Sequence, residues 1–76
     1  MITVKLYGLL RIESGIRQKQ LEAESVQQVL DVLCALGISQ KDLKGCTILI
    51  NGGSATKRSK LKDGDTVVLM SPVAGG

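Results

Sequence analysis

This chain of 76 residues has a net charge of +3, and 43% of its residues are apolar and 22% charged, a globular composition that excludes a disordered chain. Its length allows one domain that buries roughly 60% of its unfolded surface. The absence of His disfavours most metal sites and acid–base dyads, and no apolar run approaches the roughly 20 residues that span a bilayer.

Apolar and polar residues alternate at the N-terminus. The apolar positions are Ile2, Val4 and Leu6. A period of two predicts a strand over residues 2–6 with one buried face.

A second strand is predicted over residues 16–21, returning after a long loop with turn chemistry at Gly8 and at 13–15. Ile16 and Leu21 differ in parity. If both are buried, we expect a bulge or a shifted strand boundary.

A capping box begins the main predicted helix, because Ser25 is followed three residues later by Gln28. Apolar residues then recur at helical spacing. They are Val26, Val29, Leu30, Leu33 and Leu36. Gly37 supplies the left-handed residue after the helix, and Ile38 can fold back on the last turn in a Schellman ending.

The middle of the chain predicts a short helical turn and a third strand. Ser39 and Asp42 repeat the capping pattern on a smaller scale. Thr47–Ile50 is a β-rich apolar run, closed by an Asn-Gly-Gly turn at 51–53.

The last strand is predicted over Thr66–Met70, after an Asp-Gly-Asp turn at 63–65. Before it, Ala55 and Thr56 are expected to pair briefly. Pro72 cannot donate a ladder hydrogen bond, so the strand should end there and release the tail.

Four basic residues lie within six positions ahead of this strand. They are Lys57, Arg58, Lys60 and Lys62. A solvated loop is the leading interpretation and a docking surface for an acidic partner the second. Nucleic-acid binding is the third, because no aromatic residues are interleaved for base stacking.

Residues 1–5 and the cysteines indicate the cellular setting. The N-terminal sequence lacks the layout of a signal peptide, so we expect a soluble cytoplasmic protein. Cys34 and Cys46 match no Cys-x-x-Cys spacing, which favours buried reduced thiols over a disulfide. Tyr7 is the only aromatic residue, so the core should be aliphatic.

The order of elements indicates an α+β fold in which one main helix packs on a mixed four- to five-stranded sheet. The first and last strands are expected to pair as central neighbours. This is the ubiquitin-like β-grasp arrangement. The predicted domain spans residues 1–70, and residues 71–76 form a flexible C-terminal tail.

The tail is the candidate working part of the molecule. When extended, six residues reach about 20 Å, enough to place a carboxylate in another protein's active site. Gly75 and Gly76 lack Cβ atoms and can pass through a narrow channel. Because a carboxylate is a poor electrophile, acyl chemistry at Gly76 needs prior activation, for example as an acyl-adenylate. That chemistry implies a partner that uses ATP.

Residues 61–76, from the Asp-Gly-Asp turn to Pro-Val-Ala-Gly-Gly, closely resemble the ending of the MoaD/ThiS sulfur-carrier family, in particular its MoaD members, the small subunits of molybdopterin synthase. Residues 4–11 are similar to the family's opening strand and loop. The resemblance covers nearly the whole chain. The family more often has a second proline at the position of Ser71, and phenylalanines at 69–70.

The resemblance implies that an E1-like adenylating enzyme activates Gly76 with ATP and Mg²⁺. A sulfur donor, such as a cysteine desulfurase or a rhodanese-type protein, then forms a thiocarboxylate. In molybdopterin synthesis, a MoaE-like large subunit accepts the tail, and the sulfur builds a dithiolene. Gly76 is the reacting residue, and the chain itself is expected to bind no cofactor or metal. Partner contacts are implied along the tail at Pro72, Val73, Ala74 and Gly75.

The last strand offers a second candidate site. If Val67 and Leu69 face the helix, then Val68 and Met70 point outward, where exposed apolar residues favour a partner interface. Leu49 extends this patch if its neighbours point inward.

Three kinds of function stay open. A sulfur carrier leads, with molybdopterin as the first destination and tungsten cofactor, thiazole or tRNA thiolation as others. The second is a ubiquitin-like modifier joined through Gly76 to substrate lysines. The third is a β-grasp binding module that uses residues 57–62 on RNA or an acidic protein.

Overall fold

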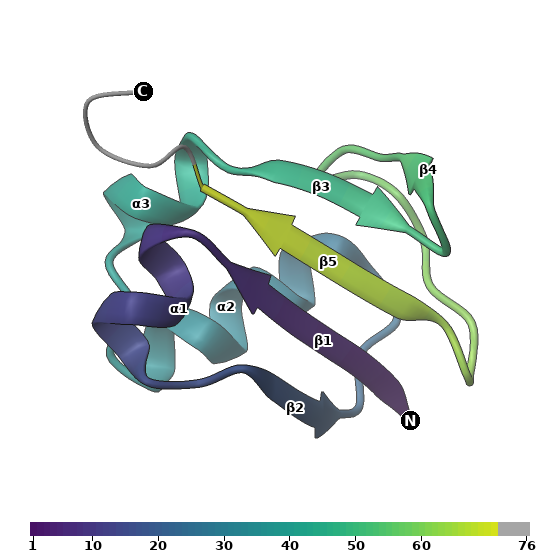
Figure 1. Cartoon of the computed structure of the whole chain (residues 1–76). Helices are drawn as coiled ribbons and strands as arrows, with labels where there is room; N and C mark the ends of the chain where they lie inside the picture. The colour runs from purple at the N-terminus through teal and green to yellow at the C-terminus, as the bar shows by residue number, and fades with distance from the viewer. Residues whose placement is uncertain (72–76) are drawn as a thin grey trace.

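The computed structural model describes residues 1–71, which form a five-stranded sheet and three helices (Figure 1). In chain order the elements are β1 (Ile2–Tyr7), α1 (Leu9–Ser14), β2 (Gln18–Leu21), α2 (Val26–Ala35), α3 (Gln40–Lys44), β3 (Thr47–Ile50), β4 (Gly53–Ser54) and β5 (Thr66–Met70). The strand order is β2-β1-β5-β3-β4, with β1 and β5 parallel and the other neighbouring pairs antiparallel. This topology confirms the predicted β-grasp fold and the central pairing of the first and last strands.

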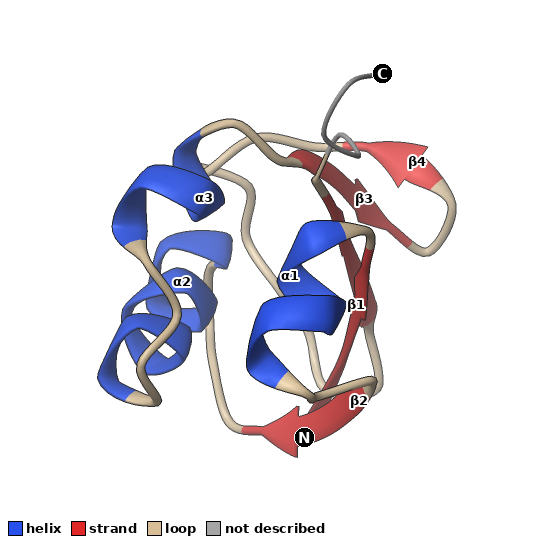
Figure 2. Ribbon diagram, turned by 60° about the vertical axis from the view of Figure 1, so that its left-hand side comes forward, coloured by secondary structure: helices blue, strands red, loops and turns tan. Residues whose placement is uncertain are grey.

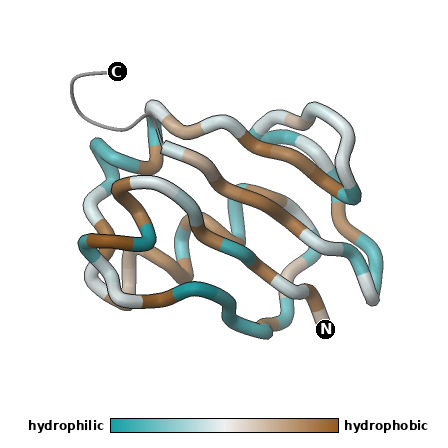
Figure 3. The backbone as a smooth tube through the Cα atoms, viewed as in Figure 1, coloured by the Kyte–Doolittle hydropathy of each residue, from teal (hydrophilic) through white to brown (hydrophobic). Residues whose placement is uncertain are grey.

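The core lies between the sheet and the helices, which sit on one side of it (Figure 2). In the central pair, Val4 lies opposite Val67 and Leu6 opposite Leu69, and all four are buried. The apolar bands of these strands run side by side through the middle of the sheet (Figure 3). The main helix covers them with four buried residues. These are Val26, Val29, Leu30 and Leu33. The core is therefore aliphatic, as predicted.

Helix α1 occupies the segment predicted as a long hairpin loop, so that prediction was wrong. Its apolar contribution is Leu10, which is fully buried, whereas Ile12 is 72% exposed. Gly15 ends the helix in the left-handed conformation. Strand β2 then begins at Gln18 instead of Ile16, which is the shifted boundary that the parity of the apolar residues required.

Helix α2 follows its predicted start and end. Ser25 Oγ accepts from the amide of Gln28 at 3.3 Å, while the Gln28 side chain accepts from the amide of Glu24 at 2.7 Å. At the C-terminal end, the amides of Gly37 and Ile38 donate back into the last turn, to Cys34 and Leu33, which is the Schellman pattern.

Two details of the predicted helices change in the structure. Leu36, expected on the apolar stripe, is 47% exposed because the helix ends there. Ser39 caps α3 by accepting from the amide of Lys41, and not from that of Asp42, the residue with which the sequence pattern paired it.

Within residues 1–71, no helix is long and apolar enough to cross a membrane.

The Asn-Gly turn sets the position of β4. Asn51 and Gly52 both have positive φ angles, 49° and 87°, as a two-residue hairpin turn of this kind requires. Pairing therefore resumes immediately at Gly53 and Ser54, opposite Ile50 and Leu49. The prediction of a short strand at 55–56 was two residues late, although the amide of residue 55 still donates to Ile48.

The Asp-Gly-Asp turn is tied to the Asn-Gly turn across the sheet. Asp65 accepts from the amide of Lys62 at 2.8 Å and from Asn51 Nδ2 at 3.0 Å. These two hydrogen bonds lower the pKa of the Asp65 carboxyl. Asn51 Oδ1 in turn accepts from the amide of Thr66, so the two turns fix the start of β5.

Candidate functional site

Some of the predicted site residues lie within the described part of the chain and the others lie beyond it. The reacting residue Gly76 and the tail positions Pro72, Val73, Ala74 and Gly75 lie outside the described residues. Val68 and Met70 lie on β5, within them. The structure therefore describes β5 and Ser71, which directly precede the remaining tail residues.

Strand β5 alternates as predicted. Val67 and Leu69 are completely buried beneath the helices, while Val68 is half-buried and Met70 is 42% exposed on the opposite face of the sheet. Leu49, beside Val68 in the register, also points to this outer face.

An apolar strip crosses three strands of the outer face. Val68 lies between Lys5 and Leu49, and Met70 lies between Tyr7 and Thr47. Tyr7 is 41% exposed. We call Tyr7, Leu49, Val68 and Met70 the outer strip. Partner interfaces are enriched in aromatic residues and Met, and this composition suits the strip to protein binding.

The outer strip ends where the tail begins, because Ser71 is anchored at the junction of β1 and α1. Its amide donates to the carbonyl of Tyr7 at 3.4 Å, and its Oγ accepts from the amide of Leu10 at 3.0 Å. Gly8, the residue before α1, has no side chain to cap that helix. Ser71 therefore supplies the missing cap from the far end of the sequence.

Gly8 makes this anchor possible by its lack of a side chain. Its backbone has φ 69° and ψ −143°, a region that is essentially restricted to glycine. A Cβ atom built on Gly8 would overlap the carbonyl oxygen of Ser71 and come within 3.1 Å of its Oγ. The corner of β1 and α1 is thus shaped around the residue that leads into the tail.

The basic segment at 57–62 lies on the helical side of the sheet, beside the N-terminus of α2. Two hydrogen bonds hold this loop to the start of α2. The carbonyl of Ser59 accepts from the amide of Val26, and the carbonyl of Lys57 accepts from the amide of Gln27. Its four basic side chains are exposed. The structure does not bring this cluster together with the outer strip or with Ser71.

The two cysteines are free thiols, as predicted, but both are half-buried instead of buried. Cys46 Sγ lies 2.8 Å from the carbonyl oxygen of Leu43. Partial burial raises the pKa of this thiol, so it stays protonated at neutral pH. Within residues 1–71, no group of three or more His, Cys, Asp and Glu side chains could hold a metal ion.

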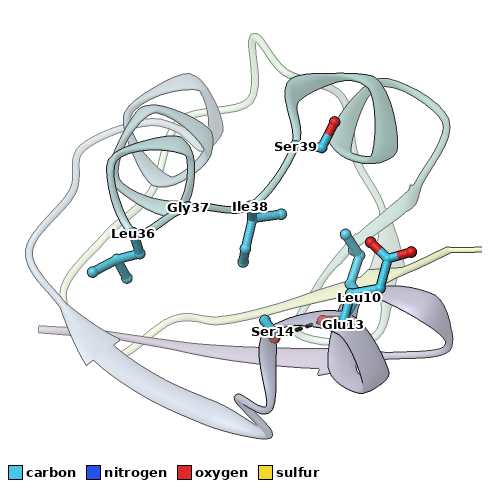
Figure 4. A pocket seen from close by; sticks show the side chains of 7 residues that line it. All are labelled: Leu10, Glu13, Ser14, Leu36, Gly37, Ile38 and Ser39. Carbon is cyan, nitrogen blue, oxygen red and sulfur yellow. Dashed lines mark hydrogen bonds between the residues drawn. The ribbon is translucent and has the colours of Figure 1, made fainter.

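A cavity of about 320 Å³ lies on the helical side of the sheet, and none of the outer-strip residues lines it. Figure 4 shows the side chains around it. They are Leu10, Glu13, Ser14, Leu36, Ile38 and Ser39, with Gly37 between the helices. A hydrogen bond with Asp42, and the repulsion between the two carboxylates, raise the pKa of Glu13. None of the residues that line the cavity was predicted as a site residue.

Sequence reasoning missed three residues of the site. Tyr7 continues the alternation of Thr3 and Lys5, so one further step of the same period places it on the outer face. The anchoring role of Gly8 and Ser71 had no comparable signal, because the two residues are 63 positions apart in the chain.

Both the sequence and the fold of this chain are similar to those of known proteins. A model of the ThiS family matches residues 4–76. The chain is similar to the small archaeal modifier protein 1 (SAMP1) from Methanosarcina acetivorans, at 29% identity and a TM-score of 0.70, over 99% of this chain and 95% of that chain. A search of curated proteins found no match.

Two structures of complexes contain chains of the same fold. One is the complex of subunits 1 and 2 of the molybdopterin-converting factor from Helicobacter pylori, with 24% identity, a TM-score of 0.74, and coverage of 99% of this chain and 97% of that chain. The other is the BexX/CysO complex from Amycolatopsis orientalis, with 21% identity, a TM-score of 0.71 and full coverage of both chains.

Proposed function

This chain belongs to the ThiS family of sulfur-carrier β-grasp proteins, and from that premise we propose that it carries sulfur as a thiocarboxylate on its C-terminal residue, Gly76. One observation supports the proposal for this molecule: the partly exposed outer strip leads directly to the anchored Ser71, from which the tail starts. A partner that covers the strip is positioned to receive the tail.

The chemistry at Gly76 takes two steps. First, a carboxylate oxygen of Gly76 attacks the α-phosphorus of ATP, forming an acyl-adenylate and releasing pyrophosphate. Second, a sulfur nucleophile attacks the acyl carbon, and AMP leaves. If the sulfur arrives as a protein persulfide, the product is an acyl disulfide, and a thiol must reduce its S–S bond to free the thiocarboxylate. ATP and Mg²⁺ are used by an E1-like adenylating partner, and this chain supplies the acyl group.

Molybdopterin synthesis is the destination we propose first. The Pro-Val-Ala-Gly-Gly ending favours it, and so does the similarity to a chain from the molybdopterin-converting factor complex. In that role the chain is the small subunit of molybdopterin synthase, a MoaE-like large subunit receives the tail, and a cysteine desulfurase or rhodanese-type protein supplies the sulfur.

Protein modification is the second candidate, and the 29% identity to SAMP1 favours it. In this case a lysine amine, instead of sulfur, attacks activated Gly76 and forms an isopeptide bond. The same apolar strip and the same anchored Ser71 serve both reactions, since both begin with the adenylate.

Mass spectrometry of the intact chain from its native host tests the proposal. We expect a fraction of the protein with one oxygen replaced by sulfur at Gly76. Conjugates that survive denaturing electrophoresis, linked through Gly76 to lysines and without any thiocarboxylate, would contradict the sulfur-carrier assignment in favour of the modifier.

Replacing Val68 and Met70 together with Asp should weaken binding of the adenylating enzyme roughly 1,000-fold, because interface hot-spot residues contribute about 2 kcal/mol each and about 1.4 kcal/mol is a factor of ten. Both residues face away from the core, so the free energy of unfolding should change little. Titration calorimetry measures the binding, and urea unfolding checks the fold.

The matched control replaces Thr66 and Gln20 with Asp. Both lie on the same outer face but beyond the strip, at the opposite end of the sheet, and the change in net charge is identical. Equal losses in the two double variants would show that added negative charge, and not the outer strip, governs binding.

A further inference from the structure

A small cavity of about 170 Å³ opens beside the tail anchor. It is lined by Lys5, Leu6, Tyr7, Arg11, Arg17 and Gln18. We propose that its three cations bind carboxylates of an acidic segment on the adenylating enzyme that activates Gly76. This inference rests on the proposed function and specifies the chemistry of the partner surface.

Three separate elements bring the cations to this cavity. Lys5 lies on β1, Arg11 on α1, and Arg17 immediately before β2. The carbonyl of Arg17 accepts from the amide of Leu6 at 3.0 Å, so its backbone is held against β1. The packing of α1 against the sheet therefore fixes their spacing. We call Lys5, Arg11 and Arg17 the basic corner.

The basic corner has no acidic partner in the described part of the chain. Within residues 1–71, the only ion pair joins the N-terminal amine to Asp63, so none of the three cations has a carboxylate within 4 Å. The seven acidic residues all lie on helices, loops and turns, and none lies on a strand. Among the residues that the structure describes, no carboxylate within 4 Å therefore compensates the positive charge of the basic corner.

The basic corner is continuous with the outer strip and with the tail anchor. Tyr7 belongs to the strip and also lines the cavity, and its carbonyl accepts from the amide of Ser71. Lys5 pairs in register with Val68 of the strip. An enzyme that covers the strip therefore lies next to the basic corner. Carboxylates on that enzyme would complement the three cations, whereas cations would be repelled.

Charge reversal tests the proposal. The variant K5E/R11E/R17E is compared with K57E/R58E/K60E, which makes the same change in net charge on the exposed loop beside the N-terminus of α2. We expect the association rate with the host's adenylating enzyme at low salt to fall roughly tenfold or more in the first variant, and the deficit to shrink as salt is added. The loop variant should stay within about threefold of the unmodified protein.

Equal losses in both variants, or no loss in the first, would overturn the proposal. The single variant R17E provides a check if the triple variant fails to fold, because Arg17 is exposed and lies outside the strands. It should lower the same association rate by a smaller factor, and an unchanged rate would count against the corner.

A titration with an amidated tetraglutamate peptide gives a readout that does not depend on adenylation. NMR amide shifts should concentrate at the basic corner and be absent in K5E/R11E/R17E, and inorganic phosphate at the same ionic strength should shift these amides less. Shifts confined to residues 57–62, or equal shifts with phosphate, would contradict carboxylate binding. If no adenylating enzyme binds the unmodified chain, the proposed function fails, and the peptide titration still decides whether the corner binds carboxylates.

Discussion

Deleting Gly76 should abolish formation of the acyl-adenylate while leaving the fold intact. The deletion moves the terminal carboxylate back by about 3.5 Å, the length of one extended residue. Reacting atoms must meet within a narrow range of distances, and a displacement of about 1 Å already reduces rates by about 100-fold. ATP–pyrophosphate exchange with the adenylating enzyme measures the loss.

Two controls accompany this deletion. Thermal unfolding should be unchanged, because the buried core is built from residues 2–69. The variant Gly76→Ala keeps the length of the chain and adds one Cβ atom, so its loss of exchange reports the narrowness of the enzyme's channel. A truncated chain that is adenylated at the normal rate would refute the assignment of Gly76 as the reacting residue.

Replacing Gly8 with Ala should destabilise the domain by about 3 kcal/mol, the upper range for a residue forced into a glycine-only backbone region. Two causes act together: the φ of 69° with ψ of −143°, and the overlap of the new Cβ with the carbonyl oxygen of Ser71. Urea unfolding measures the change as a lower midpoint at constant slope.

Gly15→Ala is the matched control for this variant. Gly15 also has a positive φ, 72°, but a Cβ built there meets nothing within 4 Å. Its substitution should cost about 1 kcal/mol, the penalty of the left-handed conformation alone. Equal costs at Gly8 and Gly15 would show that neither the ψ of −143° nor the contact with Ser71 adds to the penalty of a positive φ.

The variant Ser71→Ala distinguishes the contribution of the Ser71 Oγ from that of the Ser71 carbonyl oxygen, because it removes only the Oγ. It removes the cap of α1 and should cost about 1 kcal/mol by itself. It should not rescue Gly8→Ala, because the atom nearest the new Cβ is the backbone carbonyl oxygen of Ser71, which alanine retains. Rescue in the double variant would instead identify the Ser71 hydroxyl as the obstacle.

Local patterns in the sequence predicted most of the fold. The alternation of Ile2, Val4 and Leu6 placed β1, and the same period placed Val67 and Leu69 inside and Val68 and Met70 outside. Helix α2 was predicted from its caps and its apolar spacing. These signals need only residues two to four positions apart, which lie together in any folded form of the segment.

What the sequence by itself determined, then, was the sheet, its central strand pair, the main helix and the outward face of β5. Only the tertiary structure decided α1, the anchor between Gly8 and Ser71, and the basic corner. Helix α1 buries a single leucine and receives its cap from Ser71, 61 residues away from Leu10. Arg11 and Arg17 become neighbours of Lys5 only when that helix packs beside β1. Contacts of this kind follow from how distant segments pack together, and no periodicity along the chain records them.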